Sequence, residues 1–237
     1  MDATNALMVR LSQLLEHQKR FVRDASHQLR TPLAVLKTQV QSAQRGDVDA
    51  QQALTEISAT VDRATELANQ MLALAKVEQL RHQGLPTLQQ WDQIVRAVAL
   101  DVSPLVAAAH LEFDIETKPA AVRAHEWALR ELTRNLLHNA IKHSPVGGRL
   151  LVQVQVIDGR AVLCVTDSGP GISPQQRQRL FEPFAAFGEK GSSGLGLAIC
   201  REIVLSLDGS IELSNLTDGP PGLQVRVTLP QASDLEL

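Results

Sequence analysis

Hydrophobic positions in the first third of the chain follow a helical period. Over residues 5–44 the pattern of apolar side chains is helical, and in the second part of this stretch they recur at steps of four and three, as on one face of an α-helix. In its second part this row comprises Ala25, Leu29, Leu33, Leu36, Val40 and Ala43. Gly46 and Asp47 interrupt it, and a second row then runs toward Gly84 and Pro86. The second row comprises Leu54, Ile57, Val61, Ala64, Ala68, Met71 and Ala75. The two rows predict a helical hairpin over residues 21–83.

Two helices joined as a hairpin bury too little apolar surface to form a good core. Since each helix carries a heptad-like seam, we expect two hairpins to associate as a four-helix bundle in a homodimer. The alternative is a hairpin that packs against the C-terminal half of its own chain. Residues 1–20 already follow a helical row, with Leu7, Leu11, Leu14 and Leu15. We interpret this stretch as the remnant of a signal-relay coiled coil.

After Leu85 the pattern changes to short strands that alternate with helices. We expect helices over residues 92–109, 126–143 and 197–207, and strands over 111–115, 150–157, 160–166, 210–214 and 223–229. Asp158-Gly159 is a strong turn dipeptide between two of these strands. Residues 167–196 are rich in glycine and too long for an ordinary connection, which predicts a binding loop or lid. Residues 84–237 are therefore expected to form a separate α+β domain.

Composition narrows the possible partners. The formal net charge is −3, so we expect no general attraction to nucleic acid or to an anionic membrane. No apolar run approaches the roughly 20 residues that a bilayer helix needs. We expect the chain to be soluble and to contact a membrane only through segments upstream of it. Cys164 and Cys200 have no metal-ligand spacing and lie in apolar stretches, which favours core positions over a disulfide.

His27 is the candidate nucleophile of the hairpin. It lies between the seam residues Ala25 and Leu29, about 200° around the helix from each, and is expected to face solvent. A largely neutral imidazole can attack a phosphoryl group through its nitrogen lone pair. Pro32 lacks an N–H and clashes with the carbonyl of Gln28, so the helix is expected to bend or loosen beyond the histidine. Without further context, this histidine would be an ordinary surface residue.

The helix expected at residues 126–143 carries a row of polar side chains. Glu131, Asn135 and Asn139 recur at steps of four, and Lys142 or His143 continues the row. An amide oxygen is a good hard ligand for Mg²⁺, and a lysine can neutralise phosphate charge. The row is therefore either one wall of a nucleotide site or a merely solvated face.

Two glycine clusters follow. Asp167 ends an apolar strand and precedes Gly169 and Gly171, where the backbone could approach an adenine base while the carboxylate accepts its amine. The alternative is a simple strand-ending turn. Gly194-Leu195-Gly196 opens a predicted helix, whose exposed N–H groups could hold phosphates. The chain has no P-loop pattern around Lys190, which predicts another kind of ATP site.

Five strings together resemble the motif boxes of the histidine kinase family. In chain order they are HQLRTPL at residues 27–33 (H box), ELTRNLLHNAIKH at 131–143 (N box), DSGPGI at 167–172 (first glycine box), FEPF at 181–184 (F box) and GSSGLGL at 191–197 (second glycine box). Each string alone is a weak signal, whereas five in order are a strong one.

The resemblance implies a fold and an activity. It implies a helical hairpin followed by the α+β two-layer sandwich, or Bergerat fold, shared with gyrase-type ATPases. It implies ATP-dependent phosphorylation of His27 and transfer to an aspartate of a response-regulator receiver domain. By the same resemblance, Asn139 is the Mg²⁺ ligand and Asp167 reads adenine, while Phe181 and Phe184 anchor the lid. The chain would then be the cytoplasmic portion of a bacterial inner-membrane protein.

Two positions differ from the related proteins, one in the N box and one beside His27, and a third position, also near His27, matches the family. Related ATPases place a water-activating glutamate where this chain has Asn135, so hydrolysis should lose its base. The family commonly has an acidic residue directly after the histidine, where this chain has Gln28; Asp24 is a possible substitute proton acceptor. Thr31 matches a family position that supports dephosphorylation of the partner, although it could simply order the helix. Two rivals remain: a nucleotide-binding regulator without kinase turnover, and a hydrolytic ATPase clamp.

Overall fold

The computed structural model describes residues 2–79, 85–185, 194–217 and 219–232. The chain divides into two compact units, one comprising Met1–Leu72 and the other Ala73–Phe187 with Gly194–Leu237. The first unit contains most of the predicted hairpin, and the last residues of its second helix belong to the second unit. Helix α1 spans Asp2–Arg45 and helix α2 spans Ala50–Gln79. Gly46 starts the turn with a positive φ of 75°, and the Asp49 carboxylate accepts hydrogen bonds from the N–H groups of Gln51 and Gln52 at the start of α2.

Packing within the hairpin differs from the simple seam expected for α2. The buried positions of α2 in this unit are Ala53, Thr60 and Leu67, which recur at steps of seven. Leu54 and Val61 of the predicted row are instead 62% and 43% exposed. The predicted row therefore includes apolar side chains that the hairpin alone does not cover. The side chains of Leu7, Leu11, Leu14 and Leu15 lie outside the described residues.

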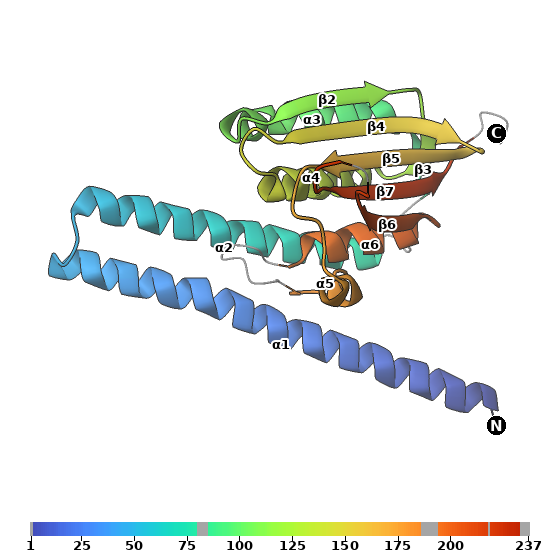
Figure 1. Cartoon of the computed structure of the whole chain (residues 1–237). Helices are drawn as coiled ribbons and strands as arrows, with labels where there is room; N and C mark the ends of the chain where they lie inside the picture. Colours follow the sequence, from blue (N-terminus) through green and yellow to red (C-terminus); the bar gives the residue numbers. More distant parts are fainter. Residues whose placement is uncertain (1, 80–84, 186–193, 218, 233–237) are drawn as a thin grey trace. The chain divides into compact units, whose positions relative to one another are not determined.

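Helix α1 continues through Pro32. The proline does not interrupt the helical backbone (Figure 1). The physical reason is that a proline removes one N–H donor and its bond to the residue four positions earlier, whereas the turns on either side keep theirs. The bend or loosening expected beyond His27 stays a prediction.

The second unit is a two-layer sandwich, as predicted. Its sheet has five strands in the order β2-β4-β5-β7-β6. These strands are β2 (Glu112–Thr117), β4 (Arg149–Ile157), β5 (Arg160–Asp167), β6 (Ser210–Asn215) and β7 (Leu223–Pro230). Helices α3 (Trp91–Ala108), α4 (Glu126–His143) and α6 (Gly196–Ser206) form the second layer, on one side of the sheet (Figure 1). Strand β2 pairs parallel to β4, and the other three pairings are antiparallel.

The core of this unit lies between the sheet and its helices. Alternate residues of β4 are buried, as are five consecutive residues of β5 (161–165) and most apolar positions of α4 and α6. Cys164 and Cys200 are both buried and unpaired, which confirms that they are core residues rather than a disulfide. Within the described part of the chain, no helix is long and apolar enough to cross a membrane.

Three short elements were missed in the sequence. Strands β1 (Thr87–Gln90) and β3 (Ala121–Ala124) form a separate two-stranded sheet. Helix α5 (Pro174–Arg179) lies inside the segment predicted as a loop, and a capping box between Ser173 and Gln176 starts it. Strand β1 is polar and mostly exposed, so it shows no alternation, and α5 has no buried residue. Both lack the periodic apolar signal on which sequence-based prediction depends.

Candidate functional site

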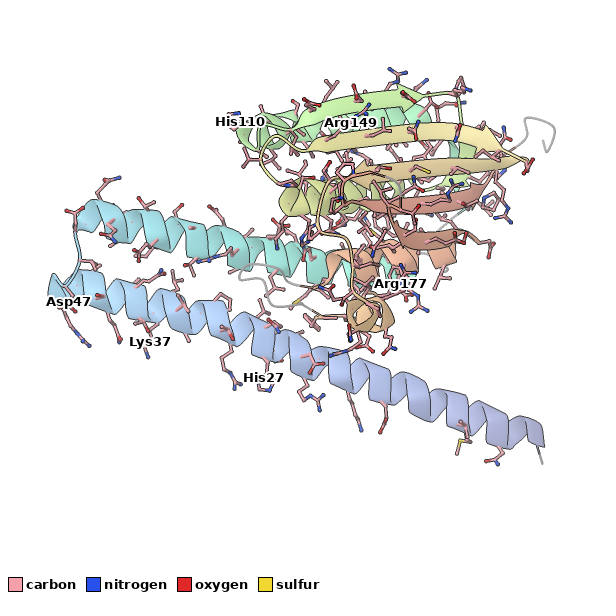
Figure 2. All side chains as sticks on the ribbon, viewed as in Figure 1. His27, Lys37, Asp47, His110, Arg149 and Arg177 are labelled. Atoms are coloured by element: carbon pink, nitrogen blue, oxygen red, sulfur yellow. The ribbon has the colours of Figure 1, made fainter. Side chains whose placement is uncertain are left out.

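The candidate phosphoacceptor lies on the hairpin. His27 is exposed, as predicted, and Figure 2 shows its side chain on the outer side of α1. Gln28 is also exposed. The Thr31 hydroxyl donates to the backbone carbonyl of His27 at 3.3 Å, one turn along the same helix. The Asp24 carboxylate accepts from Arg23 Nε at 3.2 Å. The four predicted residues of this region therefore share two turns of α1.

The polar row of α4 belongs to the second unit. Leu132, Leu136 and Leu137 point into the core and are at most 2% exposed. Asn135 is 8% exposed, and its Nδ2 donates to both the backbone oxygen and Oε1 of Glu131, at 2.9 and 2.8 Å. The division between apolar and polar faces follows the prediction. Because both amide hydrogens of Asn135 are directed to Glu131, its Oδ1 is the atom left to face the site.

The start of α6 faces this row. A Cβ built on Gly196, the first residue of α6, would lie 3.1 Å from Oδ1 of Asn135 and 3.7 Å from Nδ2 of Asn139. The second glycine cluster and the asparagine row, separate in sequence, are thus neighbours. The Leu195 side chain is fully buried, so only its backbone could serve a ligand. Lys142 and His143 are exposed at the end of α4.

Asp167 and the first glycine cluster join the same region. The Gly169 N–H donates to Oδ1 of Asp167 at 2.7 Å, and a Cβ on Gly169 would lie 2.9 Å from the backbone oxygen of His143. The end of α4 and the end of β5 are therefore in contact. Burial raises the pKa of the Asp167 carboxyl, while hydrogen bonds from Gly169 and Leu223 and the nearby His143 act to lower it.

Two residues that fix this glycine turn were not predicted. The Asn215 side chain, at the end of β6, bonds to both backbone groups of Ile172. The Ser168 hydroxyl accepts from the Arg149 N–H at 2.9 Å and donates to the Arg149 carbonyl at 3.1 Å. These partners are brought together by the register of the strands. That register cannot be predicted from the residue pattern of one sequence.

The second half of the predicted loop or lid, residues 167–196, contains one backbone contact between Phe184 and Gly194. The N–H of Phe184 donates to the carbonyl of Gly194 at 3.1 Å. Both residues have positive φ, 62° and 69°, and a Cβ on Gly194 would lie 2.7 Å from the Phe184 carbonyl carbon. The Arg201 guanidinium lies over the Phe181 ring at 5.8 Å. Residues 186–193, the body of the predicted lid, lie outside the described residues.

The predicted site residues therefore form two groups. One group, in the second unit, comprises Asn135, Asn139, His143, Asp167, Gly169, Gly194 and Gly196. The other, on α1, comprises Asp24, His27, Gln28 and Thr31. In the second unit a side chain at Gly169, Gly194 or Gly196 would come too close to neighbouring protein atoms, so these glycines allow the segments around the site to pack closely against one another. The described residues include no cluster of three His, Cys, Asp or Glu that could hold a metal ion.

Two family matches cover these two groups. Residues 17–80 match the family described as the His Kinase A (phospho-acceptor) domain. Residues 124–233 match the family described as histidine kinase-, DNA gyrase B-, and HSP90-like ATPase. The second match is to a family of ATP-binding domains. The phospho-acceptor match includes His27, and the ATPase match includes all of the glycine and asparagine positions.

Curated relatives and a solved structure agree with these matches. The chain is 34% identical to the sensor protein kinase PmrB of Pseudomonas aeruginosa over 242 residues, which cover 97% of this chain and 49% of that protein. It is 32% identical to the signal transduction histidine-protein kinase/phosphatase MprB of Mycolicibacterium vanbaalenii, over 97% of this chain and 50% of that protein. The chain thus spans about half the length of these relatives. The solved mycobacterial sensor histidine kinase MprB is 34% identical, with a TM-score of 0.57, over 62% of this chain and 97% of that structure.

Proposed function

Because the chain belongs to the sensor histidine kinase family of two-component systems, we propose that it is an ATP-dependent kinase that phosphorylates His27. The phosphoryl group would then pass to an aspartate of a response-regulator receiver domain. The observation that carries the proposal is the contact between the start of α6 at Gly196 and the amides of Asn135 and Asn139. The N–H groups at the start of α6 would then lie beside the asparagine row of α4, where Asn139 would hold Mg²⁺, and the two together would suit a triphosphate.

Each part of this site would have its own task. The Asp167 carboxylate would accept the exocyclic amine of adenine, and the backbone at Gly169 and Gly171 would lie against the base. Backbone N–H groups at Gly194, Leu195 and Gly196 would hold phosphates at the start of α6. Lys142 or His143 would meet phosphate charge, and Phe184 would hold one end of the lid. Asn139 would hold Mg²⁺, which neutralises charge between the β- and γ-phosphates when bound.

The transfer itself would need little covalent help from the protein. The lone pair of His27 Nε2 attacks the γ-phosphorus, the bond from that phosphorus to the β–γ bridging oxygen breaks, and ADP leaves. The imidazole must also lose its Nδ1 proton. Gln28 could orient the ring through a hydrogen bond but cannot accept this proton. Asp24 is the nearest carboxylate along α1, although it lies 3.2 Å from Arg23 Nε.

The position of Asn135 disfavours steady hydrolysis of ATP. An amide cannot take a proton from water at neutral pH, so the water-activating base of related ATPases is missing there. The nearest carboxylate on the same face is Glu131, which bonds to the Asn135 amide and lies 3.7 Å from Arg134. ATP would therefore persist until His27 reaches it.

The two units would have to move together for transfer. Residues 81–87 are the proposed hinge, and most of them lie outside the described residues. The exposed face of α1 around His27 would dock the receiver domain, and Thr31 would help to dephosphorylate that partner. We further propose that the chain acts as a homodimer through the apolar face of the hairpin, and as the cytoplasmic part of a longer membrane protein.

Labelling with γ-labelled ATP tests the kinase proposal. The chain should acquire an acid-labile, alkali-stable label that requires Mg²⁺ and is lost in His27→Ala. Lys37→Ala is the matched control, because Lys37 is another exposed residue of α1 (Figure 2), and it should keep the label. ATP binding without label would favour the regulator, and steady phosphate release without label would favour the hydrolytic ATPase.

A further inference from the structure

Three strands of the main sheet end in one row beside the proposed adenine site. Asp167 of β5 pairs with Leu223 of β7, and Leu223 pairs in turn with Asn215 of β6. The Leu223 N–H also bonds to the Asp167 carboxyl. The glycine turn leaves β5 at Asp167 and reaches Asn215 with Ile172. The turn therefore crosses the end of β7 and is attached at both sides.

The attachment at β6 is made by one side chain. Asn215 Oδ1 accepts from the Ile172 N–H at 2.8 Å, and Asn215 Nδ2 donates to the Ile172 carbonyl at 2.9 Å. An amide side chain presents the same donor and acceptor pair as a peptide group, so it continues the sheet as a backbone neighbour would. Asn215 is exposed, and the bonds connect residues 43 positions apart. Its side chain is therefore not needed to fill the core.

The neighbouring glycine is fitted to this attachment. Gly171 has φ 74°, and a Cβ at this position would lie 2.7 Å from Asn215 Oδ1. A side chain at position 171 would thus displace the amide oxygen that holds Ile172. At the other end of the turn, Ser168 and Asp167 bond to Arg149 and Gly169. The turn is held in one conformation before any ligand arrives.

We propose that Asn215 is a positioning residue for purine recognition. It fixes the far end of the 167–172 turn, so that the Asp167 carboxylate and the glycine backbone keep the spacing that an adenine amine requires. The inference rests on the proposed ATP site and adds to it a residue outside the five motif strings. A site built to pair with a specific amine rejects an analogue that presents a carbonyl there, because a buried acceptor is then left unpaired. Loss of Asn215 should therefore reduce selectivity for ATP over GTP.

Calorimetric titration of the full chain with ATP and with GTP, both with Mg²⁺, tests this inference. Asn215→Ala should weaken ATP binding about tenfold, as expected for the loss of two hydrogen bonds that order the turn, and should leave GTP binding unchanged. Asn215→Asp retains the acceptor for the Ile172 N–H and should have a smaller effect. Ser214→Ala, at an exposed position of the same strand, is the matched control and should resemble the wild type.

A merely structural role makes a different prediction. It would reduce ATP and GTP binding equally, whatever the change in the midpoint of thermal unfolding, whereas the positioning role lowers the ratio of the ATP affinity to the GTP affinity. An unchanged ratio in both Asn215 variants overturns the inference alone. A wild-type chain that binds no ATP overturns the proposed function as well.

A double substitution provides an independent readout. Gly171→Ala alone should weaken ATP binding, because its Cβ would displace the Asn215 oxygen. In the Asn215→Ala background the same change has no amide to displace, so it should cost several-fold less. Additive effects of the two substitutions would show that Gly171 acts without Asn215 and would contradict the proposed arrangement.

Discussion

The two units of the chain bury their apolar residues to very different extents. Among the residues of Met1–Leu72 whose burial the structure describes, Ala53, Thr60 and Leu67 are buried, whereas Leu33 and Leu54 are 59% and 62% exposed. The second unit covers most of its large apolar side chains completely, in a core between one sheet and three helices. The hairpin therefore exposes apolar side chains, as the proposed homodimer requires, whereas the second unit buries its own core.

The functional residues follow the same division. His27 is exposed on a long helix, where a partner can reach it from solvent. Asp167 and Asn135 are 4% and 8% exposed and are held by hydrogen bonds to neighbouring elements. A group that must meet several macromolecules benefits from exposure, whereas a group that reads a small molecule benefits from a fixed and largely dry position. The four predictions that follow test this division, from the largest expected effect to the smallest.

The second unit should depend strongly on single core residues. Leu132→Ala removes a fully buried side chain of α4 and should lower the free energy of unfolding by about 2–5 kcal/mol. Both tryptophans, Trp91 and Trp127, lie in the second unit, so tryptophan fluorescence in denaturant titrations reports this unit alone. Leu33→Ala is the matched control in the hairpin and should leave that transition unchanged. A comparable shift for Leu33→Ala would mean that the two units unfold as one.

Substitutions on the exposed apolar face of the hairpin should change the oligomeric state of the chain rather than the stability of the second unit. Replacement of Leu54 and Val61 together by aspartate puts charges on the exposed apolar face of α2 and should weaken dimerisation at least about 100-fold, because each lost apolar contact counts in both protomers. Sedimentation equilibrium should then give half the mass found for the wild type. Ala59→Asp adds a charge elsewhere on exposed α2 and should not dissociate the dimer. A wild-type chain that sediments as a monomer would contradict the prediction and favour packing of the hairpin within its own chain.

The proton acceptor near His27 should affect the rate of labelling moderately. Gln28→Glu restores a carboxylate beside the histidine and should raise the initial rate of autophosphorylation about tenfold, which is below the roughly 10²–10⁴-fold contribution of a typical general base. Asp24→Asn should lower that rate if Asp24 now accepts the proton. Both are measured as initial rates at saturating ATP. Unchanged rates in both variants would show that neither position takes the proton.

The buried carboxyl of Asp167 should slightly lower the free energy of unfolding at neutral pH. Because burial raises the pKa of Asp167 in the folded state, its contribution to stability is present at acidic pH and is lost as pH rises through that folded pKa. Asp167→Asn should therefore not lower the free energy of unfolding at pH 7.5, and should weaken ATP binding about tenfold. Denaturant titrations of the two proteins should converge as the pH falls. A variant that is much less stable at pH 7.5 would contradict this sign.

The sequence by itself determined most of the helices and strands of both units. The helices of the hairpin and of the second unit have strong apolar periods, and Asp158-Gly159 marks the β4–β5 turn, so these elements appeared close to their observed positions. The polar row of α4 and the exposure of His27 also followed from helical spacing alone. Such features depend on residues that lie within a few helical turns of one another in the sequence. The periodicity of apolar residues indicates structure over this short range.

Only the tertiary structure decided how the site is held. The contact of Gly196 with Asn135 depends on the packing of α6 beside α4, and the attachment of Ile172 to Asn215 depends on the register of β6, β7 and β5. The face of α2 that packs within the hairpin was likewise decided by the partner helix. The physical reason is common to all three cases: each rests on residues far apart in sequence, whose pairing is set by packing and strand register rather than by local pattern.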